Sequence, residues 1–134
     1  MLKVLVLVLL APSAAFAAVP ALCSGAANQA EGTSCAAHKL VEANRDLNRT
    51  YVELKSKLDV VGRRNLELAE NAWINFRDLE CNLEIGNDPT QVGRNGTMMP
   101  MLLGECAVSL TQQRIRDLQS QIKCPGGDLS CNAK

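Results

Sequence analysis

Residues 70–81, with the sequence ENAWINFRDLEC, gather side chains that can carry chemistry in a chain with only 3% aromatic residues. They contain the single tryptophan, Trp73, one of the two phenylalanines, Phe76, and the adjacent charged pair Arg77 and Asp78. On a helix, the tryptophan, the phenylalanine and the arginine share one broad face with the closing cysteine. This pattern is compatible with a contact surface for a partner, built on the charged pair, or with a structural seam.

The structural interpretation is favoured. In it, Trp73 and Phe76 fill the interior of a helical bundle, and the cysteine that follows them fixes the end of the helix. Arg77 lays its aliphatic stem along the core, and its guanidinium bonds a carboxylate or helix carbonyls. Asp78 lies off that face, where we expect it to reach a basic residue on a neighbouring helix such as Arg114.

The other reactive side chains do not form a catalytic set. His38 is the only histidine, so no second histidine can share a metal ion or a proton with it. Glu80 and Glu84 are four residues apart, a spacing that could hold a general acid and a general base, but a solvated helix face explains it better. The sequence therefore predicts a non-enzymatic protein with no catalytic residue, metal site or cofactor.

Six cysteines form the other chemical pattern. An even number of cysteines in an exported chain is typical of disulfides. The sequence permits many pairings, and the spacing favours pairing in chain order because the first and last pairs each enclose a short loop. A zinc site is disfavoured because no C-x-x-C motif is present. The predicted disulfides are Cys23–Cys35, Cys81–Cys106 and Cys124–Cys131.

The amino-terminal residues have the features of a signal peptide. Lys3 precedes an apolar run over residues 4–11, and Ala15-Phe16-Ala17 fits a small-residue cleavage site. The apolar run is too short to cross a membrane, which takes about 20 residues. We therefore expect residues 1–17 to be removed and residues 18–134 to form one periplasmic or secreted domain, with a short disulfide-closed tail from about residue 124.

Apolar residues recur at helical spacing through most of that domain. A first helix is predicted from a cap at Thr33 or Ser34 to about residue 58, with a break at residues 59–62. Second and third helices are predicted over residues 63–84 and from a cap at Thr97 to residue 123. The positions expected on the inward stripe are Leu40, Ala43 or Asn44, Leu47, Tyr51, Leu54, Leu58, Leu66, Ala69, Trp73, Phe76, Leu103, Cys106, Ala107, Leu110, Arg114, Leu118 and Ile122. The predicted fold is all-α, a small antiparallel bundle of about three helices with disulfides.

The longest polar stretch between the predicted helices is GNDPTQVGRNGT, residues 86–97. Gly86 is expected to end the second helix, and Pro89 prevents its continuation. This exposed loop is the predicted contact surface for a protein partner, through Gln91, Arg94, Asn95 and Thr97. Charge suggests no other class of partner: 14 basic residues balance 14 acidic ones, which gives no reason to expect binding to nucleic acid or to an anionic membrane.

Three blocks of sequence together resemble the LprI-type lysozyme-inhibitor domain family. The opening block, CSGAANQAEGTSC followed by LVEANRDLNRTYVEL, is similar to the start of that domain. AWINFRDLEC resembles its central signature, and MLLGECAVSLTQQRIRDL resembles its last element. The likeness extends over about residues 22–120. Ser34 and Asn44 depart from the usual family residues, and the tail with Cys124 and Cys131 lies outside the signature.

The resemblance implies an exported bacterial protein whose matching residues form the scaffold: Trp73, Phe76, Arg77, Asp78 and Arg114. It also implies a protein partner, and the leading hypothesis is a lysozyme-like muramidase whose cleft the protein occludes. The alternative is a structural or interaction module of the cell envelope or secretion machinery that does not inhibit lysozyme. The resemblance assigns no residue that contacts lysozyme, and the oligomeric state stays open.

Overall fold

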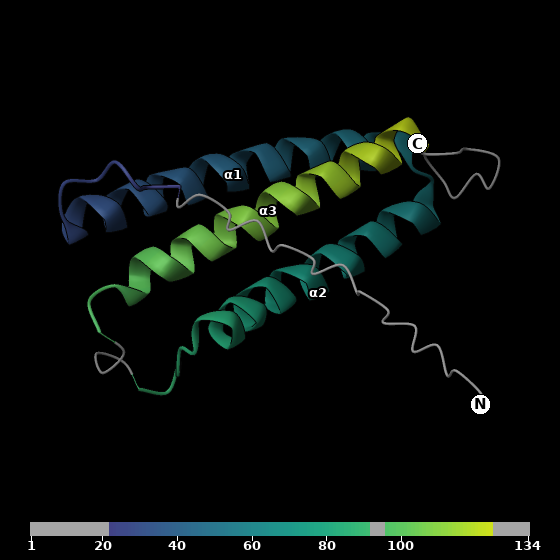
Figure 1. The fold of residues 1–134 in the computed structure, drawn as a ribbon. Helices are drawn as coiled ribbons and strands as arrows, with labels where there is room; N and C mark the ends of the chain where they lie inside the picture. The colour runs from purple at the N-terminus through teal and green to yellow at the C-terminus, as the bar shows by residue number, and fades with distance from the viewer. Residues whose placement is uncertain (1–21, 92–95, 125–134) are drawn as a thin grey trace, which may run out of the picture.

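The computed structural model describes residues 22–91 and 96–124, which form three long helices: α1 (Gln29–Lys57), α2 (Val60–Ile85) and α3 (Met99–Lys123). The chain runs along α1, returns along α2 and runs forward again along α3, so α2 is antiparallel to the other two (Figure 1). The predicted all-α bundle of three helices is confirmed. Within the described ranges, no helix is long and apolar enough to cross a membrane.

The first helix begins earlier than the sequence analysis predicted. Its N-cap is Asn28, whose side chain accepts a hydrogen bond from the backbone N–H of Glu31 at 3.0 Å. The Glu31 carboxylate in turn accepts a hydrogen bond from the N–H of Ala27 at 3.0 Å. This reciprocal capping satisfies donors that a helix start leaves unpaired. The predicted caps, Thr33 and Ser34, are wrong because they lie inside the helix that Asn28 already starts.

The other helix ends follow local sequence rules in part. Asp59 caps α2 by accepting a hydrogen bond from the backbone N–H three residues later. The helix ends at Gly86, which has a φ of 69°, a left-handed conformation that suits glycine. The predicted Thr97 cap of α3 is wrong, since Met98 occupies the cap position and makes no side-chain bond there. Pro100 lies in the first turn of α3, as expected.

Helices α1 and α3 approach each other most closely through small residues. A Cβ atom added to Gly104 of α3 would lie 3.0 Å from the Cβ of Ala36 on α1, so this contact has no spare room. Gly32, one turn earlier on α1, faces Met101 of α3 in the same way. Larger side chains fill the other end of the bundle, where the buried core consists of Leu47, Leu54, Leu66 and Leu118, with Tyr51, Leu58, Trp73, Ile115 and Ile122 packed against it.

The inward face of α2 differs from the predicted one. Leu66, Glu70 and Cys81 are buried, and Trp73 packs against the leucine core. Phe76 is 51% exposed, so the prediction that it fills the bundle is wrong. The predicted stripe assumed that apolar residues face inward. The structure instead brings a carboxylate inside and leaves the phenylalanine in solvent.

Two of the predicted disulfides are present among the described residues. Cys23 is bonded to Cys35, and Cys81 is bonded to Cys106. The first closes the loop before α1, and the second joins the last turns of α2 to α3. Cys124 is also disulfide-bonded, but Cys131 lies outside the described residues, as do residues 1–17. The third predicted pair and the signal peptide therefore stay predictions.

Candidate functional site

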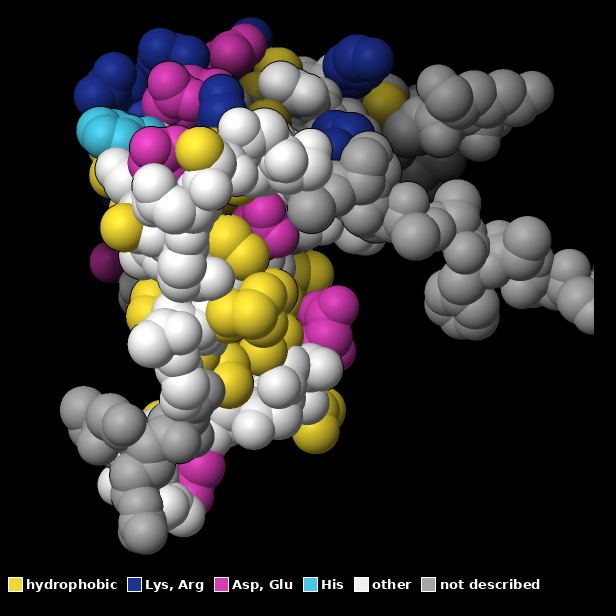
Figure 2. All heavy atoms as spheres, turned by 60° about the vertical axis from the view of Figure 1, so that its left-hand side comes forward, with side chains coloured by type: hydrophobic (Ala, Val, Ile, Leu, Met, Phe, Trp, Pro, Cys, Tyr) yellow, Lys and Arg dark blue, Asp and Glu magenta, His cyan; other side chains and the backbone are white. Residues whose placement is uncertain are grey.

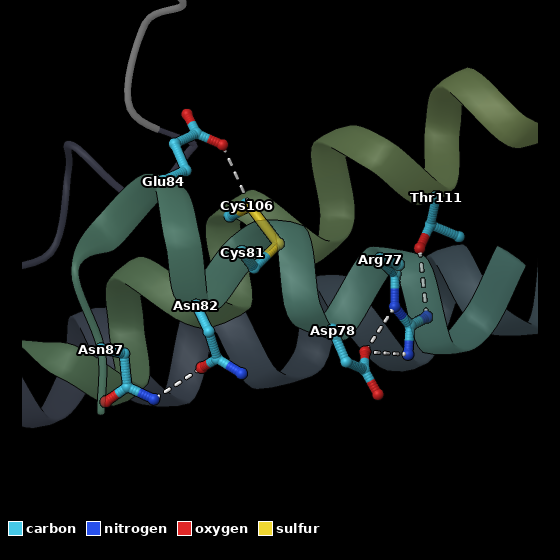
Figure 3. The surroundings of a disulfide bond; sticks show 8 residues. All are labelled: Arg77, Asp78, Cys81, Asn82, Glu84, Asn87, Cys106 and Thr111. Carbon is cyan, nitrogen blue, oxygen red and sulfur yellow. Dashed lines mark hydrogen bonds and ion pairs between the residues drawn. A yellow bond between two sulfur atoms is a disulfide. The ribbon is translucent and has the colours of Figure 1, made fainter. Parts of the chain in front are cut away.

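Arg77 is the point at which all three helices are joined by polar contacts. Figure 3 shows its guanidinium with its partners Asp78 and Thr111, the latter on α3. Its side chain is only 12% exposed and forms an ion pair with Asp78 at 2.9 Å. One of its terminal nitrogens, Nη1, donates to Asn44 Oδ1 on α1 at 3.2 Å and to Thr111 Oγ1 on α3 at 3.4 Å. A guanidinium suits this role because its donors point in several fixed directions. Arg77 therefore fixes α2 relative to both neighbours.

A second ion pair, buried on both sides, links α2 to α3. Arg114 Nε donates to Glu70 Oε2 at 3.0 Å, and the two side chains are 15% and 11% exposed. The predicted contact between Asp78 and Arg114 is wrong, because Asp78 pairs with its own neighbour in sequence and Arg114 with Glu70. The other carboxylate oxygen, Glu70 Oε1, is buried without a hydrogen-bond partner. This leaves an unused acceptor inside the protein.

Trp73 lies between these two ion pairs. The guanidinium of Arg77 is 5.5 Å from the centre of its ring and that of Arg114 is 5.9 Å away, both within the range of a cation–π contact. Trp73, Arg77, Asp78 and Arg114, four of the five residues quoted for the family scaffold, thus belong to one set of contacts, whereas Phe76 is exposed. Together with their partners, these four form a scaffold, called here the Arg77 cluster: Asn44, Glu70, Trp73, Arg77, Asp78, Thr111 and Arg114.

Sequence reasoning missed Glu70 as a member of this cluster. The signal was present in the spacing, because Leu66, Glu70, Trp73, Arg77 and Cys81 recur every three or four residues and share one helix face. Burying the charges of Glu70 and Arg77 without partners would cost free energy. The sequence analysis therefore favoured an inward face that included the apolar Phe76. The two charges are accommodated here because each has a partner of opposite charge.

Between α1 and α2 lies an open cleft of about 360 Å³. Helix α1 packs along α3, whereas α2 is tied mainly to α3 and makes few direct contacts with α1 (Figure 1). The resulting space has amide, carboxylate and aromatic groups along its sides. The lining residues are Asn44, Leu47, Asn48, Tyr51, Glu67, Glu70, Asn71, Ile74 and Arg77. We call this space the α1–α2 cleft.

The loop predicted to contact a partner starts from a well-ordered base. The Asn87 side chain donates to Asn82 Oδ1 at 2.6 Å, directly after the end of α2. Asp88 accepts hydrogen bonds from the backbone N–H and the hydroxyl of Thr90, and from the amide of Gln91. These bonds lower the pKa of Asp88, because they favour its charged form. The Cys81–Cys106 disulfide joins the two helices that flank this loop in sequence, α2 and α3 (Figure 3).

Of the predicted contact residues, Gln91 follows the end of α2 and Thr97 precedes the start of α3. Gln91 and Thr97 are exposed, while Arg94 and Asn95 lie outside the described residues. His38 is exposed on α1, far in sequence from the loop. In the parts of the chain that the structure describes, no three His, Cys, Asp or Glu side chains are arranged to hold a metal ion.

Comparison with known proteins shows which family contains this scaffold. Residues 23–118 match the family model described as lysozyme inhibitor LprI. The chain belongs to the LprI lysozyme-inhibitor family. It is also 29% identical over 110 residues to an uncharacterized protein of Rhizobium meliloti (strain 1021), an alignment that covers 72% of this chain and 76% of the relative. No solved structure matches it.

Family membership agrees with the chemistry of the chain in one respect. The family match begins at Cys23 and ends at Leu118, so it contains both described disulfides and the whole Arg77 cluster. Disulfides persist in oxidising compartments outside the cytoplasm. The two bonds therefore indicate an extracytoplasmic protein.

Proposed function

We propose that this LprI-family protein is an exported, non-enzymatic inhibitor that binds a lysozyme-like muramidase and occludes its catalytic cleft. The observation that carries the proposal is the family match over residues 23–118. A periplasmic or secreted location fits the two disulfides and the signal peptide predicted at residues 1–17.

The contact surface proposed for this role is the loop containing Gln91, Arg94, Asn95 and Thr97. Catalytic clefts of glycoside hydrolases contain a pair of carboxyl groups, which a cationic side chain such as Arg94 would complement. The local hydrogen bonds of Asp88 and the disulfide between the two helices that flank the loop support this choice. A loop that is already ordered at its base loses less conformational entropy on binding.

A cell-wall lysis assay tests the proposal. The exported protein is mixed in micromolar excess with c-type, g-type and i-type lysozymes in turn, and the expected result is inhibition of at least one class. Arg94→Ala should weaken that inhibition, whereas Arg116→Ala, a change on the exposed surface of α3, should not. Full activity of all three enzymes would contradict inhibition, and equal inhibition by both variants would contradict the loop alone.

A specific observation also favours the alternative, a structural or interaction module of the cell envelope. Apolar side chains line the outer face of α2, opposite the core: Val61, Leu68, Phe76, Leu79 and Leu83, with exposed fractions from 51% to 77%. The part of the surface seen in Figure 2 also has hydrophobic side chains gathered below a charged region that contains the only histidine. Exposed apolar patches commonly mark interaction sites.

The two proposed functions predict different effects of mutations on that outer face. If the protein is an envelope module, Leu79→Lys with Leu83→Lys should remove crosslinks to its envelope partner, and no lysozyme should be inhibited. If it is an inhibitor acting through the loop, the same double variant should inhibit as strongly as the native protein. Loss of lysozyme inhibition in this variant would move the inhibitory surface from the loop to α2.

A further inference from the structure

We propose that the outer face of α2 is a self-association surface, through which two copies of this protein form an antiparallel dimer with two-fold symmetry. The inference is independent of lysozyme inhibition, which is proposed for the loop after α2. Seven exposed positions, separated by steps of three and four residues, form this face along the length of the helix, and none of them is charged: Val61, Asn65, Leu68, Ala72, Phe76, Leu79 and Leu83.

The seven positions are symmetric about Ala72, because the steps away from it are four, three and four residues in either direction. If two copies of α2 pack antiparallel with the symmetry axis at Ala72, every position of one copy meets a position of the same face on the other. The small side chain at the centre lets the helices approach, and larger side chains pair farther out, with Leu68 beside Phe76. A two-fold interface requires this kind of self-complementarity. Asn65 is the one polar side chain on the face.

The charged residues at the two ends of α2 have opposite signs. Arg63 and Arg64 lie near its start. Asp78, Glu80 and Glu84 lie near its end. This order is the reverse of the one that the helix dipole favours, which places acidic residues at the start and basic residues at the end. The last turns of α1 and α3, which lie at the same end of the bundle as the start of α2, also contain lysines (Figure 1). An antiparallel second copy would bring an acidic end to this basic one.

Arg64 and Asp78 show the complementarity in detail, since they lie along the same side of the outer face. In the antiparallel pair, Arg64 of one copy lies within one turn of Asp78 of the other, and the symmetry repeats this contact. A parallel pair would instead place like charges together. Asp78 is 60% exposed, and both of its contacts with Arg77 use Oδ1, which leaves Oδ2 for a second guanidinium (Figure 3).

The length of the face indicates how strong the association should be. From Val61 to Leu83 it extends about 33 Å. If each copy buries about a third of the helix circumference, the pair buries roughly 900 Å² in total, at the lower limit for specific association. We therefore expect a weak dimer, with a dissociation constant on the order of tens of micromolar. Well below that concentration the protein is a monomer, and Phe76 contributes to unfolding as an exposed side chain.

Sedimentation velocity measures the association directly. Between about 1 µM and about 1 mM, the weight-average mass of the exported protein should rise from the monomer value towards twice that value. Ala72→Glu places two carboxylates against each other at the centre of the interface and should weaken the association at least about tenfold. Ala30→Glu, the same change at an exposed position of α1, should associate like the native protein. Arg64→Glu should weaken the association about threefold to tenfold at low salt and less at high salt.

Cysteine crosslinking tests the direction of the pair. Under mild oxidation, Ala72→Cys should form a covalent dimer, because the two copies of residue 72 meet at the symmetry axis. Leu79→Cys should not, because in the antiparallel pair its two copies lie about 20 Å apart along the helices. Stronger crosslinking at residue 79 than at residue 72 would contradict the antiparallel arrangement.

The proposal is overturned if the mass stays at the monomer value at the highest concentration, or if Ala72→Glu associates as tightly as the native protein. Leu83→Ser, a change at a position that is 77% exposed, tests the same face if Ala72→Glu does not fold. A monomer that cosediments with vesicles of phosphatidylcholine and phosphatidylglycerol would make the face a membrane contact. A monomer that crosslinks only to another envelope protein would make it the site of that partner. Either result overturns dimerisation.

Discussion

Helix α2 is attached to the bundle by a different kind of interaction from the one that joins α1 to α3. At the α1–α3 contact, Gly32, Ala36 and Gly104 let the backbones approach closely, and a methyl group added at Gly104 would lie 3.0 Å from the Cβ of Ala36. At the α2–α3 contact, a buried ion pair and the Cys81–Cys106 disulfide replace most of that close packing. One interface is specified by shape and the other by charge and a covalent bond.

The difference explains why the functional candidates gather around α2. A helix held at a few points can stand away from α1 and leave the α1–α2 cleft open. It can also present an apolar outer face without disturbing the core, because the inward positions are fixed by paired charges. The α1–α3 pair then serves as the rigid support, and α2 with the loop after it supplies the surfaces available to ligands and partners.

The largest expected effect comes from breaking the charged attachment. Glu70→Ala should lower the free energy of unfolding by about 3–5 kcal/mol, because it leaves the buried guanidinium of Arg114 without its partner. Urea denaturation measures this loss. The double change Glu70→Leu with Arg114→Met should cost clearly less than Glu70→Ala, since no unpaired charge remains. If the double variant is less stable than the single variant, the attraction between Glu70 and Arg114 contributes more free energy than burying the two charges costs.

Trp73 and Phe76 offer a paired test of which face of α2 is inside. Trp73→Ala should cost roughly 3 kcal/mol, because the ring packs on the leucine core and under two guanidinium groups. Phe76→Ala should cost less than about 1 kcal/mol, because the side chain is 51% exposed. Thermal unfolding of both variants checks the comparison. Equal losses would mean that the phenylalanine is covered in solution, as it would be in a complex with a partner.

Trp73 and Phe76 also show which parts of the fold can be predicted from the sequence and which cannot. The three helices, the Gly86 cap and the order of the cysteines follow from local signals, and the structure has the helices and that cap. The inward face of α2 does not follow, because the helix has two candidate apolar faces. The choice between them depends on Arg114 and Thr111, which lie more than 30 residues away in sequence and come close only after folding.

The α1–α2 cleft also could not be predicted from the sequence. Asn48 and Asn71 are ordinary exposed residues in their own helices, and nothing in their local sequence brings them together. They line one space only because α2 is held off α1 by contacts made elsewhere. The loop candidates could be predicted from the sequence because length, polarity and glycine content are local properties, and they stay predictions; Arg94 and Asn95 fall outside the described residues.

The packed interface can be tested with two glycines. Gly104→Ala places a methyl group 3.0 Å from the Cβ of Ala36, an atom that cannot move without moving the helix. Overpacking of this kind costs about 1–3 kcal/mol, which should outweigh the gain of roughly 1 kcal/mol in helix propensity. Gly32→Ala meets the sulfur of Met101, a flexible side chain that can turn away, so the helix gain should dominate. Chemical denaturation should therefore show opposite signs, and destabilisation by both changes would mean that Met101 is as fixed as Ala36.

The smallest effect is expected at the loop, where Asp88 holds a local turn at the solvent-exposed surface. Hydrogen bonds from the hydroxyl and the backbone N–H of Thr90 and from the amide of Gln91 lower the pKa of Asp88 from its usual value of 3.8. A lowered pKa in the folded state means that the turn is stabilised at pH above 3.8 and loses this contribution as the pH falls through the lowered value. The amide signal of Thr90 should report that transition in a pH titration followed by nuclear magnetic resonance.

Asp88→Asn is the matched control for that titration, because it keeps an acceptor oxygen for Thr90 but cannot ionise. In this variant the Thr90 signal should not respond to acid over the same pH range. The unfolding free energy should hardly change in either form, because the Asp88 turn is local and partly exposed to solvent, and the Cys81–Cys106 disulfide holds the two flanking helices together independently. A Thr90 transition above pH 3.8 would show that the hydrogen bonds do not favour the carboxylate. The ordered base proposed for the lysozyme-contacting loop would then lose its electrostatic support and depend on the disulfide alone.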